Sequence, residues 1–192
     1  MVSEELNRYL PQPGDVILMR SEEIGILRVL KDWLLDSPWG HVAIFFDHTK
    51  RGLPLVVESI GRGVMIRSLL ASEGRYILVL RHKIQQVALK AAKVAERLAD
   101  NPESWYGYLD IPRYVIPRLI WYKFTGRRFS FGYKHNPHFI CSELVDEAFD
   151  HIIPEELQPP LPHDFLAVPA LERIWEGKYL PRESSMPNWL GR

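Results

Sequence analysis

Short runs of apolar residues, separated by turn-forming residues, dominate the first half of the chain. The runs cover residues 16–19, 40–46, 55–60, 64–66 and 76–80. Runs of this length between Gly, Pro and Asp are typical of strands, whereas helices need longer segments. The polar segment 47–54 joins the second run to the third, and this arrangement predicts a hairpin with a long loop. The first half therefore predicts four or five strands.

Three other segments repeat their apolar residues with the period of a helix. One begins at Ser21 and keeps an apolar face as far as residue 35, and a second covers 84–99, rich in alanine and lysine. The third begins at Cys141. Its apolar stripe consists of Cys141, Leu144, Val145, Ala148, Phe149 and Ile152, and its polar face of Glu143, Asp146, Glu147 and Asp150.

The last quarter of the chain predicts little regular structure. Prolines recur through 154–169 and favour irregular backbone there. A short final helix is expected at 170–176, followed by a frayed tail. Strands flanked by segregated helices predict an α+β fold with a mainly antiparallel sheet. At 192 residues we expect a single domain, 1–192, with a core at about 13–168 and a C-terminal helix and tail at 170–192.

Charge and composition exclude several classes of partner. The chain holds 24 basic and 24 acidic residues, so it lacks the overall positive field of a typical nucleic-acid-binding protein. No segment approaches the ~20 apolar residues of a transmembrane helix. The acidic start at 1–5 does not resemble a secretory signal, and one cysteine allows no internal disulfide. We expect a cytoplasmic protein with no nucleic-acid partner, no cofactor and no transmembrane segment.

Cys141 is the chain's only cysteine, and it stands where a helix is expected to begin. Unpaired N–H groups and the positive end of the helix dipole favour the thiolate at such a position. The same N–H groups can hold an oxyanion. The alternative is a buried, inert cysteine that acts as a small hydrophobe.

His41 is the first candidate for a base that acts with this thiol. His41 and Glu58 lie on the two expected strands of the hairpin. Pairing His41 directly with Glu58 centres the turn inside the polar loop, and pairing it with Ile60 leaves Glu58 diagonal on the same face. In either register Glu58 can approach His41 and orient its imidazole. The alternative reading is a histidine at a strand end and a solvated glutamate.

Other histidines allow a different interpretation. His135 and His138 precede Cys141 at three-residue intervals and form a possible zinc-ligand set. That set would need a fourth ligand and a helical backbone, which the Asn136-Pro137 step disfavours. We therefore expect no metal, and a metal-binding regulator stays the alternative.

The order of these segments along the chain resembles a known family. The segments are Pro13-Gly14-Asp15-Val16-Ile17-Leu18, Gly40-His41-Val42-Ala43-Ile44, Val57-Glu58-Ser59-Ile60-Gly61-Arg62-Gly63-Val64, Leu78-Val79-Leu80-Arg81, Tyr106-Gly107-Tyr108-Leu109 and Phe139-Ile140-Cys141-Ser142-Glu143-Leu144-Val145. Together they resemble the circularly permuted papain-like amidases of the NlpC-like superfamily. The pattern is most similar to the bacterial YiiX and YaeF group, and more distantly to lecithin retinol acyltransferase-like proteins.

This resemblance implies a permuted papain-like fold and a set of catalytic roles. Cys141 would be the nucleophile, His41 the general base and acid, and Glu58 the orienting residue. Tyr108 or Tyr106 would match the family's tyrosine near the site as an oxyanion donor, or else pack as an ordinary aromatic residue. Many members have aspartate between two such tyrosines, where this chain has Gly107.

The implied reaction is acyl transfer through a thioester on Cys141, with a peptide, isopeptide or cell-wall-derived amide as the expected substrate. The alternatives are a lipid amide or ester substrate, transfer of the acyl group to a second acceptor, and a non-catalytic module that binds a peptide or lipid. Arg62, between two glycines, is a candidate for binding a substrate carboxylate. The aromatic and aliphatic segment 114–128 is a possible membrane-contact surface, or else core or pocket wall. The sequence does not predict an oligomeric state.

Overall fold

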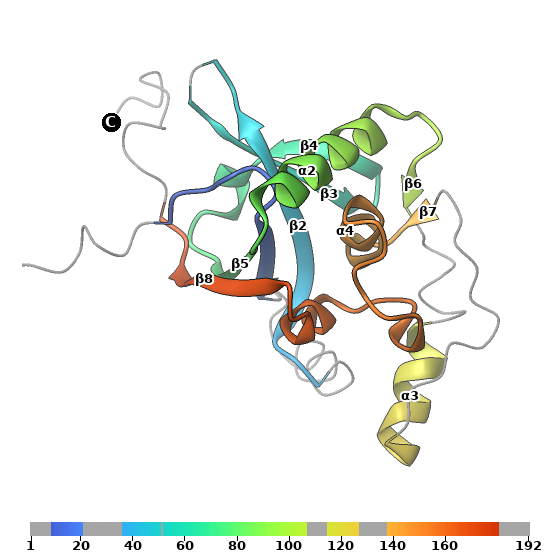
Figure 1. Ribbon diagram of the computed structural model, residues 1–192. Coiled ribbons are helices and arrows are strands. Elements are labelled where there is room, and N and C mark those ends of the chain that lie inside the picture. Colours follow the sequence, from blue (N-terminus) through green and yellow to red (C-terminus); the bar gives the residue numbers. More distant parts are fainter. Residues whose placement is uncertain (1–8, 21–35, 51, 107–114, 127–137, 181–192) are drawn as a thin grey trace, which may run out of the picture.

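The centre of the molecule is a six-stranded antiparallel sheet. The computed structural model describes residues 9–20, 36–50, 52–106, 115–126 and 138–180. The strands follow the order β4-β3-β2-β1-β5-β8 across the sheet (Figure 1). Their bounds are β1 Val16–Arg20, β2 Trp39–His48, β3 Pro54–Ile60, β4 Gly63–Ser68, β5 Tyr76–His82 and β8 Leu171–Lys178.

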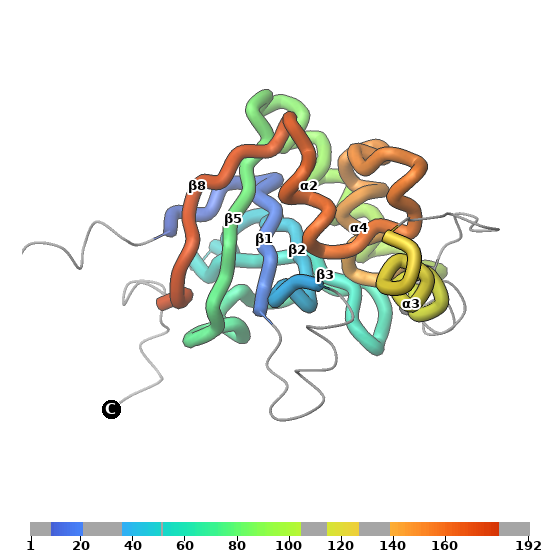
Figure 2. Tube along the Cα trace, turned by 90° about the horizontal axis from the view of Figure 1, so that it is seen from below, coloured from blue at the N-terminus to red at the C-terminus, as the bar shows by residue number. Residues whose placement is uncertain are grey.

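Two helices cover one face of this sheet, α2 (Gln85–Asp100) and α4 (Cys141–Ala148) (Figure 2). The buried face of α2 consists of alanines at helical spacing, which allow the helix to lie close to the strands: Ala88, Ala91, Ala92 and Ala95. A third helix, α3 (Ile116–Thr125), projects at the lower right of Figure 1. A short parallel pair, β6 (Trp105–Tyr106) and β7 (His138–Phe139), leads into α4.

Alternation along the strands divides the apolar residues into two cores. One core lies between the sheet and the helices and includes Val16, Leu18, Val42, Ile44, Leu78, Leu80, Leu144 and Val145. The other lies on the opposite face and includes Ile17, Met19, Ala43, Phe45, Val56, Ile77 and Val79. Both faces of the central strands are thus buried, so the strands read as continuous apolar runs in the sequence.

The α+β class and the mainly antiparallel sheet are confirmed, with three corrections. The main sheet has six strands rather than four or five. The expected C-terminal helix at 170–176 is wrong, because Leu171–Lys178 forms strand β8 and pairs with β5 from His82↔Leu171 to Tyr76↔Lys178. The core therefore extends beyond residue 168. The expected Cys141 helix reaches only Ala148.

Pairing explains why a helix does not form at β8. Without β8 the edge of β5 would carry a row of unpaired backbone groups. Trp175 of β8 also stacks on Tyr9, with ring centroids 6.0 Å apart, in the core opposite the helices. These long-range contacts outweigh the local helical pattern. The helix expected from Ser21 lies outside the described residues.

No helix among the described residues is long and apolar enough to cross a membrane.

Gly14, two residues before β1, lies directly against the backbone of α2. Its φ is +89°, a conformation that favours glycine, and an added Cβ would lie 2.2 Å from the carbonyl oxygen of Ala88. We expect Gly14→Ala to lower the free energy of unfolding by about 2–4 kcal/mol, through backbone strain and overlap with α2. Urea unfolding measures the loss.

Gly52→Ala is the matched control for this prediction. Gly52 also has a positive φ, +76°, but an added Cβ would meet no atom within 4 Å. It should cost only the strain, about 1–2 kcal/mol. Equal losses in the two variants would contradict the close packing of Gly14 against α2.

Candidate functional site

Cys141 is the first residue of α4, as the spacing predicts. Ile140 before it is extended, with φ −79° and ψ 166°, so the chain enters the helix through a sharp change of direction. The Glu143 carboxylate accepts a hydrogen bond of 2.7 Å from the Ile140 N–H and secures this turn. The cysteine is thus held among the N–H groups that begin the helix.

The N-terminus of α4 meets the sheet where β2 and β3 stop pairing. Their pairing runs from His48↔Pro54 to Ile44↔Val57, whereas β3 continues to pair with β4 as far as Ile60↔Gly63. In the region beyond Val57, the Ser59 hydroxyl donates a hydrogen bond of 2.5 Å to the carbonyl of Phe139, two residues before Cys141. This contact fixes the approach of the cysteine to the sheet.

The sulfur of Cys141 lies beside strand β2. It accepts hydrogen bonds from the backbone N–H of Val42 and of Ser142, and it also bonds to the His41 side chain. A strand's backbone N–H points sideways, in the plane of the sheet, so an acceptor bonded to it lies at the strand's flank. At this flank the sulfur is within hydrogen-bonding reach of the His41 side chain, which β2 carries.

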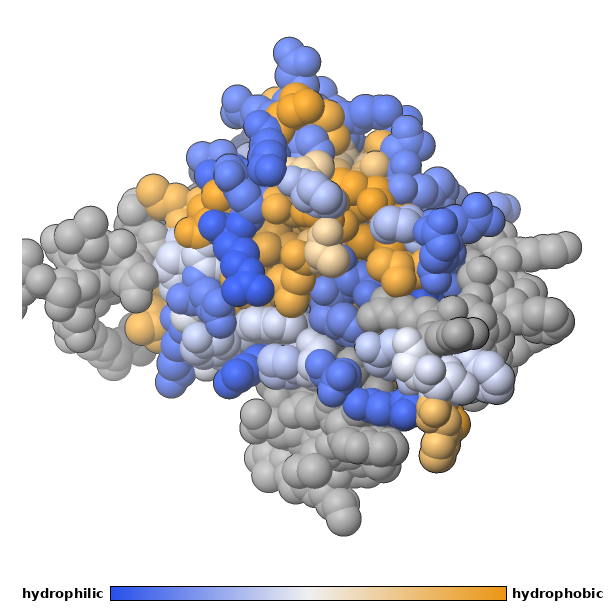
Figure 3. All heavy atoms as spheres, turned by 60° about the horizontal axis from the view of Figure 1, so that its bottom comes forward, coloured by the Kyte–Doolittle hydropathy of each residue, from blue (hydrophilic) through white to orange (hydrophobic). Residues whose placement is uncertain are grey.

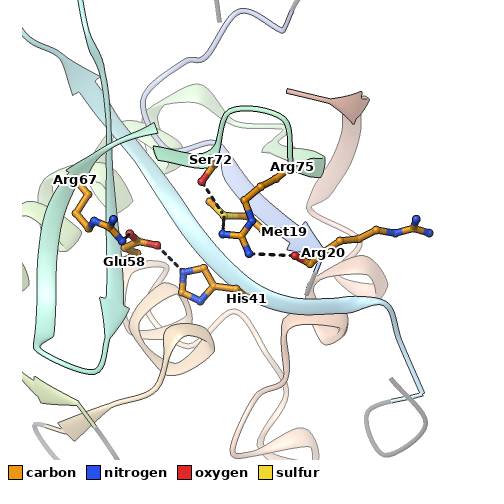
Figure 4. Close-up of polar contacts among 7 residues, drawn as sticks. All are labelled: Met19, Arg20, His41, Glu58, Arg67, Ser72 and Arg75. Atoms are coloured by element: carbon orange, nitrogen blue, oxygen red, sulfur yellow. Dashed lines mark hydrogen bonds and ion pairs between the residues drawn. The ribbon is translucent and has the colours of Figure 1, made fainter. Parts of the chain in front are cut away.

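His41 is held between the sulfur and a carboxylate. Its Nε2 lies 2.6 Å from Oε2 of Glu58, which leaves Nδ1 for the sulfur. Glu58 in turn accepts a hydrogen bond of 2.8 Å from Nη1 of Arg67 on its other oxygen. Figure 4 shows the three side chains, with His41 on β2, Glu58 on β3 and Arg67 on β4. The side chains of His41 and Glu58 are 19% and 8% exposed, so water weakens their interaction little.

These contacts favour an ion pair between sulfur and imidazole. Burial lowers the pKa of His41, but the charges of Cys141 and Glu58 and the hydrogen bonds to both outweigh it and raise the pKa to about 9. Burial raises the pKa of the Cys141 thiol, but His41 and the N–H groups of Val42 and Ser142 outweigh burial and hold that pKa below its ordinary value. Both shifts favour the thiolate with an imidazolium over the neutral pair.

Glu58 stays ionised for a similar reason. Burial raises the pKa of its carboxyl, but the hydrogen bonds and positive charges of His41 and Arg67 outweigh burial and lower the pKa. The reading of Glu58 as a solvated strand residue is therefore wrong. An ionised Glu58 fixes the position of the imidazole and supports its positive charge.

Sequence reasoning missed Arg67. The two-residue turn at Gly61 and Arg62 fixes the pairing of β3 with β4, with Glu58 opposite Met65 and Val56 opposite Arg67. Arg67 is therefore diagonal to Glu58 on the same face. The same register argument, applied to the turn between β3 and β4, would have predicted the contact between Arg67 and Glu58.

The polar face expected for α4 is also corrected. Glu143 and Asp146, assigned to solvent by the helical pattern, are 5% and 1% exposed. Asp146 accepts hydrogen bonds from the Ile153 N–H at 2.8 Å and from the Gln158 side chain at 2.7 Å. The Ser142 hydroxyl donates to the carbonyl of Pro160 at 2.6 Å. These bonds tie α4 to the proline-rich segment and hold its N-terminus in place.

The remaining candidates from the sequence lie apart from this group or outside the described residues. Arg62 is exposed in the turn between β3 and β4. Tyr108 and His135 lie outside the described residues, as do the side chains of Tyr106 and His138. The oxyanion and zinc assignments that involve them stay predictions.

The described residues contain no group of three or more acidic, histidine or cysteine side chains suited to a metal ion. Cys141, His41 and Glu58 form a chain with the imidazole in the middle, and both of its nitrogens are engaged. Metal ligands instead converge on one point. The arrangement of these three residues suits proton transfer between neighbours better than coordination of an ion.

Comparisons with known proteins support the fold. No protein-family model and no curated protein matches the sequence. Among solved structures, the fold is similar to that of YiiX from Escherichia coli O157:H7, described as a metalloprotein of the DUF1105 family. The TM-score is 0.51 and the identity 14%, over 88% of this chain and 98% of that one. The chain therefore shares a YiiX-like fold, in agreement with part of the resemblance found in the sequence.

Proposed function

We propose that the protein is a cysteine hydrolase that cleaves an amide bond, with Cys141 as nucleophile, His41 as general base and acid, and Glu58 as orienting residue. The observation that carries the proposal is the unbroken chain from the sulfur through both imidazole nitrogens to the carboxylate. Nucleophile, base and orienting group in contact are the signature of covalent acyl transfer.

We further propose that the YiiX-like fold is a circularly permuted papain-like fold. The histidine strand precedes the cysteine helix, since β2 carries His41 and α4 carries Cys141. Papain itself has the reverse order. The cysteine at the start of a helix that packs on an antiparallel sheet supports this assignment.

The proposed reaction proceeds in two steps. The Cys141 thiolate attacks the carbonyl carbon, and the imidazolium of His41 gives its proton to the leaving amine as the carbon–nitrogen bond breaks. The resulting thioester is hydrolysed by a water molecule whose proton passes to His41, and the thiolate leaves as the acid product forms. The backbone N–H groups at the start of α4 are available to stabilise the oxyanion of each tetrahedral intermediate.

Peptides, isopeptides and cell-wall fragments fit this reaction. A lipid amide or ester, or transfer of the acyl group to an acceptor other than water, is the second candidate. The observation that favours a lipid-like substrate is that α3 packs beside Ile140, next to the cysteine, and carries exposed apolar residues on its other side.

Electrophilic probes test the proposal. Acyloxymethyl ketones linked either to a peptide or to a fatty-acyl chain should label the native protein on Cys141, located by mass spectrometry of the digested adduct. Preference for one probe class identifies the substrate class. Absence of labelling by both probes, or equal labelling of native and urea-unfolded protein, would contradict an organised nucleophile.

Glu58→Gln keeps the size of the side chain and removes its charge. We expect kcat/KM to fall about 10- to 100-fold, and the alkaline limb of the pH profile to move to lower pH, because the imidazolium loses a stabilising charge. Arg67→Met should shift the limb in the same direction by less, since the Arg67 side chain is 41% exposed. A pH profile of kcat/KM measures both.

Arg173→Met is the matched control, because Arg173 is an exposed arginine of strand β8. It removes the same charge without touching Glu58 and should leave the profile in place. If Arg67→Met and Arg173→Met behaved alike, the link from Arg67 through Glu58 to His41 would be refuted.

A further inference from the structure

Helix α3 has one buried and one exposed side. Leu119, with Val115 just before the helix, packs against Ile140 and Leu161, and Arg118 donates a hydrogen bond to the carbonyl of Pro159. The exposed fractions of the apolar residues on the other side are 37% for Ile116, 45% for Ile120, 49% for Trp121 and 83% for Phe124. The buried side anchors the helix, so the exposed apolar side is a fixed feature of the surface.

The exposed residues follow the helical repeat. Ile116, Ile120 and Phe124 are four residues apart and form one stripe, with Trp121 beside it. The helix ends at Thr125, and Gly126 caps it with φ 67° and an N–H bond to the Tyr122 carbonyl, so Phe124 lies in the last turn. Figure 3 shows apolar side chains at the lower right, where this helix projects from the body.

The sequence around α3 is entirely free of acidic residues. Residues 111–142 contain six of the 24 basic residues and none of the 24 acidic ones. Two of these basic residues, Arg127 and Arg128, follow the end of α3 in the sequence. Lys123 is engaged with Asp36, at 3.1 Å. The charge of this segment contrasts with the overall neutrality of the chain.

We propose that the exposed side of α3 docks the protein on an anionic lipid surface. Phenylalanine, isoleucine and tryptophan beside arginines are the composition of helices that lie in the membrane interface. A ten-residue helix is about 15 Å long and about 10 Å across. The area of its exposed side is well below the ~800 Å² that each partner buries in a stable protein interface. A second copy of the chain is therefore a poor partner for this side of α3. An apolar edge with flanking positive charge suits a bilayer surface instead.

Docking in this way places α3 between the lipid surface and Ile140, which begins the turn into α4. The buried side of α3 touches Ile140, the residue directly before the cysteine. The surface contact itself does not depend on the proposed hydrolase activity, because it involves neither Cys141 nor His41.

Vesicle co-sedimentation of the full chain tests the proposal. The protein should bind vesicles of equal parts phosphatidylglycerol and phosphatidylcholine, bind pure phosphatidylcholine at least about tenfold more weakly, and lose binding in high salt. Phe124→Glu should abolish binding. Replacing Arg127 and Arg128 with glutamine should weaken it about fivefold for each arginine at low salt.

Two controls match these variants. Leu89→Glu places the same charge on an exposed apolar residue of α2, and Lys90→Gln with Lys93→Gln removes two exposed charges there. Both should bind like the wild type, and circular dichroism checks that all variants fold. Absence of wild-type binding, or equal loss in the α2 variants, would overturn the proposal. So would a wild-type dimer in sedimentation velocity that Phe124→Glu converts to monomers, since a second copy would then cover α3.

Discussion

Substituting serine for Cys141 is expected to lower kcat/KM by at least about 10³-fold for any substrate that the wild type hydrolyses. Serine is the closest replacement in shape, but its hydroxyl stays protonated near neutral pH, and the ion pair with His41 is lost. The pKa of the Cys141 thiol lies below its ordinary value because of groups placed around the sulfur, and these groups cannot ionise an alcohol to the same degree. Steady-state kinetics with the substrate class identified by the probes measures the loss.

The fold should survive this substitution. The serine hydroxyl can accept the same N–H bonds from Val42 and Ser142, so the midpoint of thermal unfolding should move by only a few degrees. Ser142→Ala is the matched control, because it removes the buried bond to the Pro160 carbonyl and keeps the sulfur. We expect Ser142→Ala to lower the free energy of unfolding by about 1–2 kcal/mol. Its loss of kcat/KM should be far smaller than that of Cys141→Ser. A Cys141→Ser protein with near wild-type kcat/KM would eliminate the covalent mechanism.

The contact between His41 and Glu58 could be predicted from the sequence because it is local. One hairpin carries both residues, and alternation places them on one face. The observed pairing of Phe45 with Val56 and of Ile44 with Val57 corresponds to the second of the two registers considered, in which Glu58 is diagonal to His41. A shift between Phe45 and Asp47 changes the register nearer the loop, and no pattern of apolar residues marks such a bulge.

The contact between His41 and Cys141 could not be derived from periodicity. It depends on the end of the β2–β3 pairing at Ile44↔Val57 and on the bond from Ser59 to Phe139, two residues 80 positions apart in the chain. Only the resemblance of segment order placed the two side chains in one site. Helical spacing located Cys141 at the start of α4, but it could not show that the sulfur lies beside a strand.

Helical patterning failed where polar groups are buried. Glu143 and Asp146 fall on the polar face by spacing, and the fold buries both because each accepts hydrogen bonds from backbone or amide groups. A pattern of apolar and polar positions cannot distinguish a solvated carboxylate from a buried acceptor. The prediction of a helix at 170–176 failed for a related reason. Strand β8 forms there because it covers the open edge of β5, and the sequence of β8 itself does not show that edge.

His41→Ala is expected to slow alkylation of Cys141 by iodoacetamide at pH 6 by at least about tenfold. A thiol with an ordinary pKa of ~8.5 is only about 0.3% ionised at this pH, and loss of the imidazolium returns the thiol toward that value. His48→Ala is the matched control, since His48 is an exposed histidine of the same strand β2. It should alkylate like the wild type. Rates at a series of pH values measure the shift.

Alkylation and turnover should respond differently at high pH, and this difference tests the role of His41 as an acid. The pKa of His41 is raised to about 9, so its proton is present below that value and lost above it. In the proposed mechanism turnover needs this proton for the leaving amine, and kcat/KM should therefore fall as the pH rises through about 9. Alkylation needs only the thiolate and should not fall. If both rates stayed level across this range, His41 would serve to ionise the sulfur without acting as the proton donor.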